Sequence, residues 1–129
     1  MRPLKRAVVV DDNRISRMIL RDMLRGYGAD VVEAADGDRA FELILEHQPE
    51  LVISDVLMPR CDGFALASRI NQQEMSQPPV LFLTSAVYKS AHWKHEILTT
   101  YHADAFLPKP IDPQTLDRTL RRHFEIASS

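Results

Sequence analysis

The chain has 129 residues with a formal net charge of -2, and 45% of its residues are hydrophobic and 26% charged. This composition is typical of a soluble globular protein and does not favour direct nucleic-acid binding. The apolar stretches are too short to cross a bilayer, so we expect no membrane insertion. The single cysteine cannot form an internal disulfide, which suits the cytoplasm. We expect one domain over residues 1–129, with its core at about 5–124.

Five short runs of β-branched and aliphatic residues predict strands at 7–10, 30–33, 51–53, 80–83 and 105–107. Three of these runs show almost no alternation of apolar and polar residues. Such continuous apolar runs are typical of strands that are covered by helices on both faces of a sheet.

Amphipathic segments lie between the predicted strands and indicate helices. Asp112 and Pro113 form a favourable start for the helix near the C-terminus, because Asp caps free N–H groups and Pro suits the first helical position. We expect residues 125–129 to fray. The predicted apolar stripes are Ile15, Met18, Ile19 and Met23; Ala40, Phe41, Ile44 and Leu45; Leu66, Ala67 and Ile70; and Leu116, Leu120 and Phe124.

Strands that alternate with helices predict an α/β fold, in which a doubly wound parallel sheet has helices on both faces. In such sheets, ligands bind where the carboxyl ends of the strands meet. Asp11 and Asp12 follow the first predicted strand, and Asp55 follows the third. Thr84 follows the fourth strand and Lys109 the fifth. We therefore expect these five side chains at one edge of the sheet.

Three carboxylates at one edge repel one another unless a cation lies between them. Mg²⁺ prefers oxygen ligands, and a metal so placed can also bind a phosphoryl oxygen. A carboxylate can itself attack phosphorus, with Lys109 and Thr84 available to bind the phosphoryl oxygens. The sequence thus predicts a magnesium-dependent phosphoryl site at this edge.

These residues lie in short segments that together resemble the response-regulator receiver domain, the CheY-like family of bacterial two-component signalling. The segments are residues 10–12 (VDD), 54–59 (SDVLMP) with Gly63, 83–85 (LTS) and 109–110 (KP). Each segment alone is common, but all four occur in order at strand ends. The resemblance extends from Lys5 to about Phe124. It implies a flavodoxin-like five-stranded parallel sheet with strand order 2-1-3-4-5.

The resemblance also implies a role for each residue of the acidic set. Asp55 matches the phosphoacceptor, which takes its phosphoryl group from a histidine kinase, a phosphotransfer protein or a small phosphodonor. Asp12 matches the direct Mg²⁺ ligand, and Asp11 the carboxylate that supports it. Together with Asp55, the main-chain carbonyl of Leu57 would complete the protein's share of the metal ligands.

The remaining matched residues are those of a switch. Thr84 matches the hydroxyl that turns toward the phosphoryl group, and Lys109 matches the lysine that binds it. The bond between Lys109 and Pro110 is expected to be cis. Phe106 matches the aromatic residue that rotates on activation. A downstream target protein would then bind the face near the fourth and fifth strands.

Other interpretations remain open. The same fold could serve as a pseudo-receiver, a constitutive protein-interaction module that is not phosphorylated. A phosphohydrolase is disfavoured, because such enzymes place a second Asp where this chain has Leu57. We therefore expect the chain to catalyse only its own phosphorylation and dephosphorylation, without turnover of external phosphoesters. We also expect it to be a stand-alone receiver. Trp93 lies in the segment 87–96, beside Lys89, and could pack within the domain or bind a partner.

Overall fold

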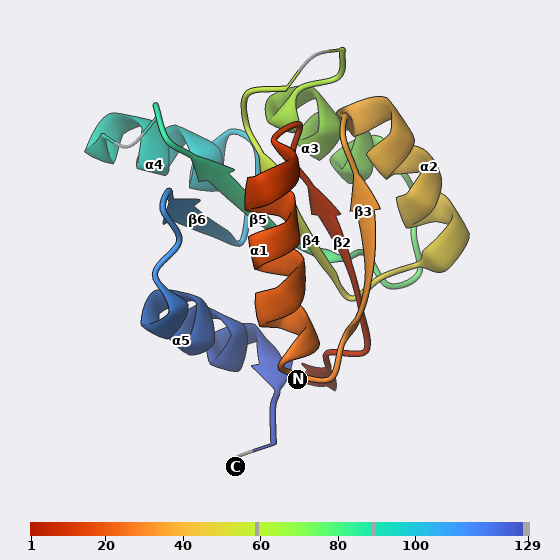
Figure 1. The fold of residues 1–129 in the computed structure, drawn as a ribbon. Coiled ribbons are helices and arrows are strands. Elements are labelled where there is room, and N and C mark those ends of the chain that lie inside the picture. The colour runs from red at the N-terminus through yellow and green to blue at the C-terminus, as the bar shows by residue number, and fades with distance from the viewer. Residues whose placement is uncertain (59, 89, 128–129) are drawn as a thin grey trace.

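The computed structural model describes residues 1–58, 60–88 and 90–127. Its main sheet has five parallel strands: β2 (Arg6–Val10), β3 (Asp30–Ala34), β4 (Leu51–Asp55), β5 (Val80–Ser85) and β6 (Ala105–Pro108). Their order across the sheet is β3-β2-β4-β5-β6, which corresponds to the predicted order 2-1-3-4-5 (Figure 1). The predicted fold class is confirmed.

Five helices connect the strands in the described part of the chain: α1 (Arg14–Arg25), α2 (Gly37–His47), α3 (Gly63–Gln72), α4 (Ala91–Thr99) and α5 (Pro113–His123). Each begins after a residue whose side chain accepts a hydrogen bond from a backbone N–H of the first turn, which satisfies a donor that has no partner within the helix. These capping residues are Asn13, Asp36, Asp62, Ser90 and Asp112. The predicted start of α5 at Asp112 and Pro113 is confirmed.

Both faces of the sheet are covered, and each face has its own hydrophobic core. Val9 and Phe82 point to one face, where they pack with residues of α1 and α5 such as Leu24. Val8 and Leu83 point to the other face, where α2, α3 and α4 pack. Consecutive residues of a strand point to opposite faces, so continuous apolar strands supply both cores.

The predicted apolar stripe of α1 is only partly correct, because Met23 packs against the core whereas Ile15 and Ile19 do not. Ile15 and Ile19 are 70% and 58% exposed, whereas Leu20 and Leu24 are buried against the sheet. Arg17 and Arg21, on the same helix, form salt bridges with Glu33 of β3. Burial of Leu20 and Leu24 in the core therefore sets the rotation of α1 and leaves the two isoleucines outside. On α2, the predicted core residue Leu45 is likewise exposed.

A second, small sheet joins the two ends of the described chain, where β1 (Arg2–Pro3) pairs in parallel with β7 (Phe124–Glu125) (Figure 1). The expectations for this region were therefore wrong in two respects. Phe124 is not part of the helix, because its backbone is extended, and Glu125 is paired rather than frayed. Phe124 is nevertheless buried in the α1–α5 core, as its apolar side chain requires.

One polar contact connects the turn after α1 to α5, and it yields a stability prediction. The Tyr27 hydroxyl donates a hydrogen bond of 2.7 Å to Asp117 Oδ1. Burial, together with this hydrogen bond, raises the pKa of Tyr27 to about 12. We expect Tyr27→Phe to lower the free energy of unfolding at pH 8 by about 1 kcal/mol, the usual net contribution of a hydrogen bond.

The effect of Tyr27→Phe should depend on pH in a defined direction. Since the folded-state pKa lies above the value of about 10 in the unfolded chain, the contribution is complete below pH 10. It is lost as the pH rises toward 12. Urea unfolding at pH 8 and pH 11 should therefore give a smaller difference between parent and variant at the higher pH. An equal difference at both pH values would contradict this assignment.

Candidate functional site

The predicted residues lie together at the carboxyl edge of the sheet. Asp11 and Asp12 follow β2, and Asp55 is the last residue of β4. Asp55 is the register partner of Thr84 in β5, and Lys109 follows β6 directly. Parallel strands that end at one edge thus bring side chains from four distant segments into a single site.

Three carboxylates form the centre of this site. Asp11, Asp12 and Asp55 each offer an oxygen within 4.8 Å of the other two. Asp11 is 4% exposed and Asp55 is 8% exposed, while Asp12 faces solvent. An all-oxygen set with one open, solvated side fits Mg²⁺, which binds through few carboxylates and retains several waters. The donor chemistry therefore fits the metal that the sequence predicts.

Lys109 partly neutralises the buried carboxylates. Its Nζ lies 2.6 Å from Asp11 Oδ2 and 3.3 Å from Asp55 Oδ2. Burial raises the pKa of the Asp55 carboxyl above its usual value, and the positive charge of Lys109 offsets only part of this effect. Burial acts to lower the pKa of Lys109, but the hydrogen bond that Lys109 donates to Asp11 and the negative charges of Asp11 and Asp55 raise it overall. Lys109 therefore stays protonated at neutral pH.

The backbone around Asp11 is held by a residue that the sequence analysis did not single out. Arg17 donates a hydrogen bond of 2.8 Å to the carbonyl of Asp11, and its Nε pairs with Glu33 at 3.0 Å. Asp11 Oδ1 accepts a further hydrogen bond from the N–H of Asn13. Glu33 is the last residue of the predicted strand 30–33, but nothing in the sequence paired it with Arg17. These contacts orient the Asp11 carboxylate toward Lys109.

Thr84 and Phe106, which the sequence analysis matched to switch residues, are both buried. Thr84 is buried at the edge of the sheet, where its carbonyl accepts a hydrogen bond from the N–H of Val56. Phe106 is buried in the core on the α2–α3–α4 face. The Lys109–Pro110 bond is cis in the structure, which is the isomer that the resemblance implies.

The roles that the sequence analysis assigns to these residues stay predictions, and two parts of the predicted site need a separate remark. The Leu57 side chain is exposed beside the acidic set, and the use of its carbonyl as a metal ligand is an expectation from the resemblance. Pro59, the last residue of the 54–59 motif, lies outside the described residues, as does Lys89 near Trp93.

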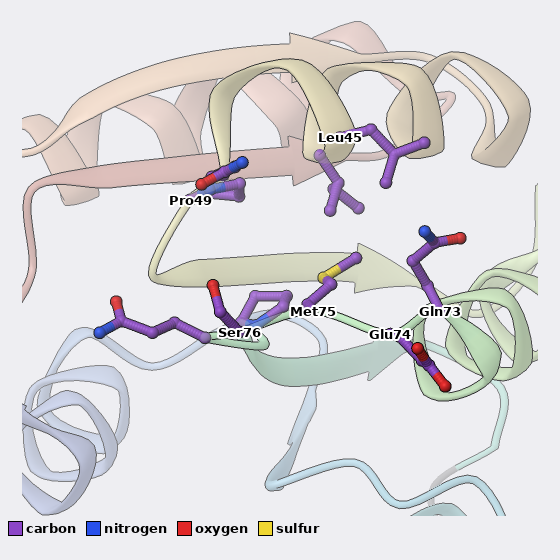
Figure 2. Close-up of a pocket in the computed structure, with 10 residues that line it drawn as sticks. Leu45, Pro49, Gln73, Glu74, Met75 and Ser76 are labelled. Atoms are coloured by element: carbon purple, nitrogen blue, oxygen red, sulfur yellow. The ribbon is translucent and has the colours of Figure 1, made fainter.

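Two cavities lie at opposite edges of the sheet. One, of about 440 Å³, is lined by Asp11, Thr84 and Lys109 together with apolar residues of α1. The other, of about 290 Å³, lies near the amino ends of β4 and β5, where Leu45 and Met75 point toward each other (Figure 2). None of the predicted site residues lines this second cavity. The chemistry-bearing residues therefore belong to the carboxyl edge.

A close backbone contact behind Asp55 supports a second stability prediction. A Cβ added at Gly63 would lie 2.4 Å from the Asp55 carbonyl oxygen and 2.8 Å from Val56 Cα. We expect Gly63→Ala to lower the free energy of unfolding by about 1–3 kcal/mol, as overpacking does. Gly26→Ala is the matched control, because its nearest contact is 3.2 Å. Urea unfolding of both variants tests this, and equal stabilities would argue against a tight contact at Gly63.

The fold and the site define a class of protein: doubly wound α/β domains with an acidic pocket and a paired lysine at the carboxyl edge of the sheet. The family model of the response regulator receiver domain matches residues 7–121. The chain belongs to this family, which consists of CheY-like receivers of two-component signalling.

Individual relatives agree with this assignment. The chain is 31% identical over 128 residues to the probable transcriptional regulator ycf27 of Porphyridium aerugineum, covering 97% of this chain and 51% of that protein. It is 29% identical over 127 residues to the regulatory protein PhoP of Bacillus subtilis, covering 96% and 51%. The structure is similar to chemotaxis protein CheY4 of Vibrio cholerae, with a TM-score of 0.83, 28% identity, and coverage of 94% and 99%.

The chain spans about half the length of these two curated relatives. Whether the receiver is stand-alone, over one domain of residues 1–129, therefore stays a prediction. Within residues 1–58, 60–88 and 90–127, the helices are all too short or too polar to span a membrane.

Proposed function

We propose that this receiver is a signalling switch in which Asp55 accepts a phosphoryl group in a Mg²⁺-dependent reaction. The observation that supports it is the grouping of three carboxylates within 4.8 Å, with the Lys109 ammonium in contact with two of them. Such crowding is unfavourable in a resting domain, and an incoming cation and phosphoryl group would relieve it. The donor would be a histidine kinase, a phosphotransfer protein or a small phosphodonor.

In the proposed reaction, a carboxylate oxygen of Asp55 attacks phosphorus, and the bond between phosphorus and the donor breaks with its electrons leaving on the donor. Bound Mg²⁺, held by Asp11, Asp12, Asp55 and the Leu57 carbonyl, would neutralise negative charge on the phosphoryl oxygens. Lys109 would move from its contact with Asp55 to a phosphoryl oxygen. Nothing corresponds to the second catalytic Asp of a phosphohydrolase, so catalysis would be limited to the chain's own phosphoryl group.

The acyl phosphate would then bias the conformation of the domain. The Thr84 hydroxyl would donate a hydrogen bond to the phosphoryl group, and Phe106 would rotate into the space that Thr84 leaves. Typical coupling of about 1–3 kcal/mol shifts such an equilibrium roughly 5- to 150-fold. A downstream target in the cytoplasm would bind the face formed near β5 and β6, which are the fourth and fifth strands of the main sheet.

The proposal is tested by incubating the chain with acetyl phosphate in the presence and absence of Mg²⁺ and measuring the mass of the intact protein. We expect a single phosphoryl addition only when Mg²⁺ is present. Binding of beryllofluoride, which imitates an acyl phosphate, should likewise require Mg²⁺. A chain that binds neither under any metal condition would be a pseudo-receiver, and the proposed switch would be wrong.

A further inference from the structure

Two arginines of α1 share one carboxylate of β3, next to the acidic site. Glu33 Oε1 lies 3.0 Å from Arg17 Nε, and Glu33 Oε2 lies 3.2 Å from Arg21 Nη1. The two arginine side chains are similarly buried, at 18% and 20% exposed. They differ in their second contact, because Arg17 also donates to the carbonyl of Asp11, whereas Arg21 pairs with Asp22. The proposed reaction uses neither arginine.

Asp11 is held at each of its polar groups. Its N–H donates a hydrogen bond of 3.1 Å to the carbonyl of Ala34, and Oδ1 accepts one of 2.9 Å from the N–H of Asn13. Oδ2 accepts one of 2.6 Å from Lys109, and the carbonyl accepts one of 2.8 Å from Arg17. Two of these four contacts are with backbone groups and one is with the site lysine. Arg17 is therefore the contact that a side-chain substitution can remove without changing the site itself.

The carbonyl that Arg17 holds belongs to the peptide group between Asp11 and Asp12. A peptide group is planar, so fixing its oxygen also fixes the Cα atoms of both aspartates. Asp12 faces solvent, so the direction of its carboxylate depends on this backbone. Burial acts to raise the pKa of Glu33, but the hydrogen bonds from Arg21 and Arg17 lower it overall. Glu33 is therefore ionised at neutral pH and holds the planar guanidinium of Arg17 in place.

We propose that Arg17, held by Glu33, is a positioning residue that presents Asp11 and Asp12 together to Mg²⁺ and thereby sets the affinity of the site for the metal. The inference rests on the proposed function, since it concerns the same metal site. Groups that orient metal ligands contribute roughly 10- to 100-fold in affinity. An effect of charge alone would have the opposite sign, because removing a positive charge near the site would strengthen the binding of a cation.

The test measures binding of Mg²⁺ alone to the full chain by isothermal titration calorimetry, without a phosphodonor. Arg17→Met keeps the apolar stem of the side chain and removes the guanidinium. We expect the dissociation constant for Mg²⁺ to rise about tenfold in this variant. Arg21→Met is the matched control, because Arg21 is equally buried and pairs with the same Glu33 but binds Asp22 in place of Asp11. We expect this control to bind Mg²⁺ like the parent.

A second measurement separates a positioning role from a structural one. The rate of labelling by acetyl phosphate is recorded as a function of Mg²⁺ concentration. We expect Arg17→Met to need about tenfold more Mg²⁺ for its half-maximal rate and to reach the parent rate at saturation, because Arg17 acts on the metal ligands and not on the phosphoryl group. A loss of packing between α1 and β3 would instead destabilise both arginine variants without separating their Mg²⁺ requirements.

Glu33→Gln provides an independent variant, which decides the question if Arg17→Met does not fold. It keeps the shape of the side chain but removes the charge that holds Arg17, so we expect weaker Mg²⁺ binding than in the parent. NaCl at about 0.5 M in all titrations screens charges beyond roughly 4 Å, so that the change reflects contacts.

The outcomes distinguish this inference from the proposed function. If the parent binds no Mg²⁺, the proposed metal site fails and the positioning role fails with it. If the parent binds Mg²⁺ and folded Arg17→Met binds it as tightly or more tightly, only the positioning role is wrong. Equal weakening in Arg17→Met and Arg21→Met, or an unchanged dissociation constant in Glu33→Gln, would also overturn the positioning role.

Discussion

Asp55→Asn is expected to reduce phosphorylation by acetyl phosphate to the background of a reaction without Mg²⁺. The substitution keeps the shape of the side chain but removes the carboxylate that would attack phosphorus. It should not unfold the domain, since it removes one of three mutually repelling charges. Intact-protein mass spectrometry measures the phosphorylation, and urea unfolding measured in parallel shows whether the variant is folded.

The matched control for this prediction is Asp30→Asn. Asp30 is an exposed aspartate at the opposite, amino end of a strand in the same sheet. We expect this variant to be labelled like the parent chain. Labelling that persists in Asp55→Asn would place the acceptor at another residue, and the assignment of Asp55 would then be wrong.

Lys109→Ala is expected to have the largest effect on stability. The substitution leaves Asp11 and Asp55, both buried, without the ammonium that contacts them. Removing one partner from a buried ion pair usually costs about 3–5 kcal/mol, and because the Lys109 side chain is 19% exposed we expect about 2–3 kcal/mol without Mg²⁺. Added Mg²⁺ should recover more stability in this variant than in the parent, because it supplies the missing positive charge.

Phosphotransfer in Lys109→Ala should also slow by roughly 10- to 150-fold, since a hydrogen bond to a charged group contributes roughly 1.5–3 kcal/mol. Lys109→Arg is the control, because it keeps the charge and changes the geometry. It should retain most of the stability of the parent. A Lys109→Ala variant as stable and as fast as the parent would show that this lysine has no part in the site.

The sequence predicted the site more accurately than it predicted the packing around it. Asp12, Asp55 and Lys109 could be placed together because a parallel sheet brings the carboxyl ends of its strands to one edge. That inference needed only the order of the elements. Each of the three residues lies two positions after the end of a predicted apolar run, so its position did not depend on side-chain detail.

Features that depend on pairs of distant residues could not be predicted in this way. The rotation of α1 buries Leu20 and Leu24 and places Ile15 outside. It also pairs Arg17 and Arg21 with Glu33 of a different element, which no local pattern indicates. Phe64 of α3 stacks on Trp93 of α4, and no local sequence pattern relates these two residues.

The most direct test of the site is the dependence of stability on Mg²⁺ in the parent chain and in Asp12→Asn. Asp12 is exposed, so its substitution should leave the fold intact. At ten times its dissociation constant, Mg²⁺ should raise the free energy of unfolding of the parent by about 1.4 kcal/mol, and that of the variant by much less. NaCl at matched ionic strength controls for screening. An equal response to Mg²⁺ in both proteins, or no response in the parent, would contradict a metal site at the three carboxylates.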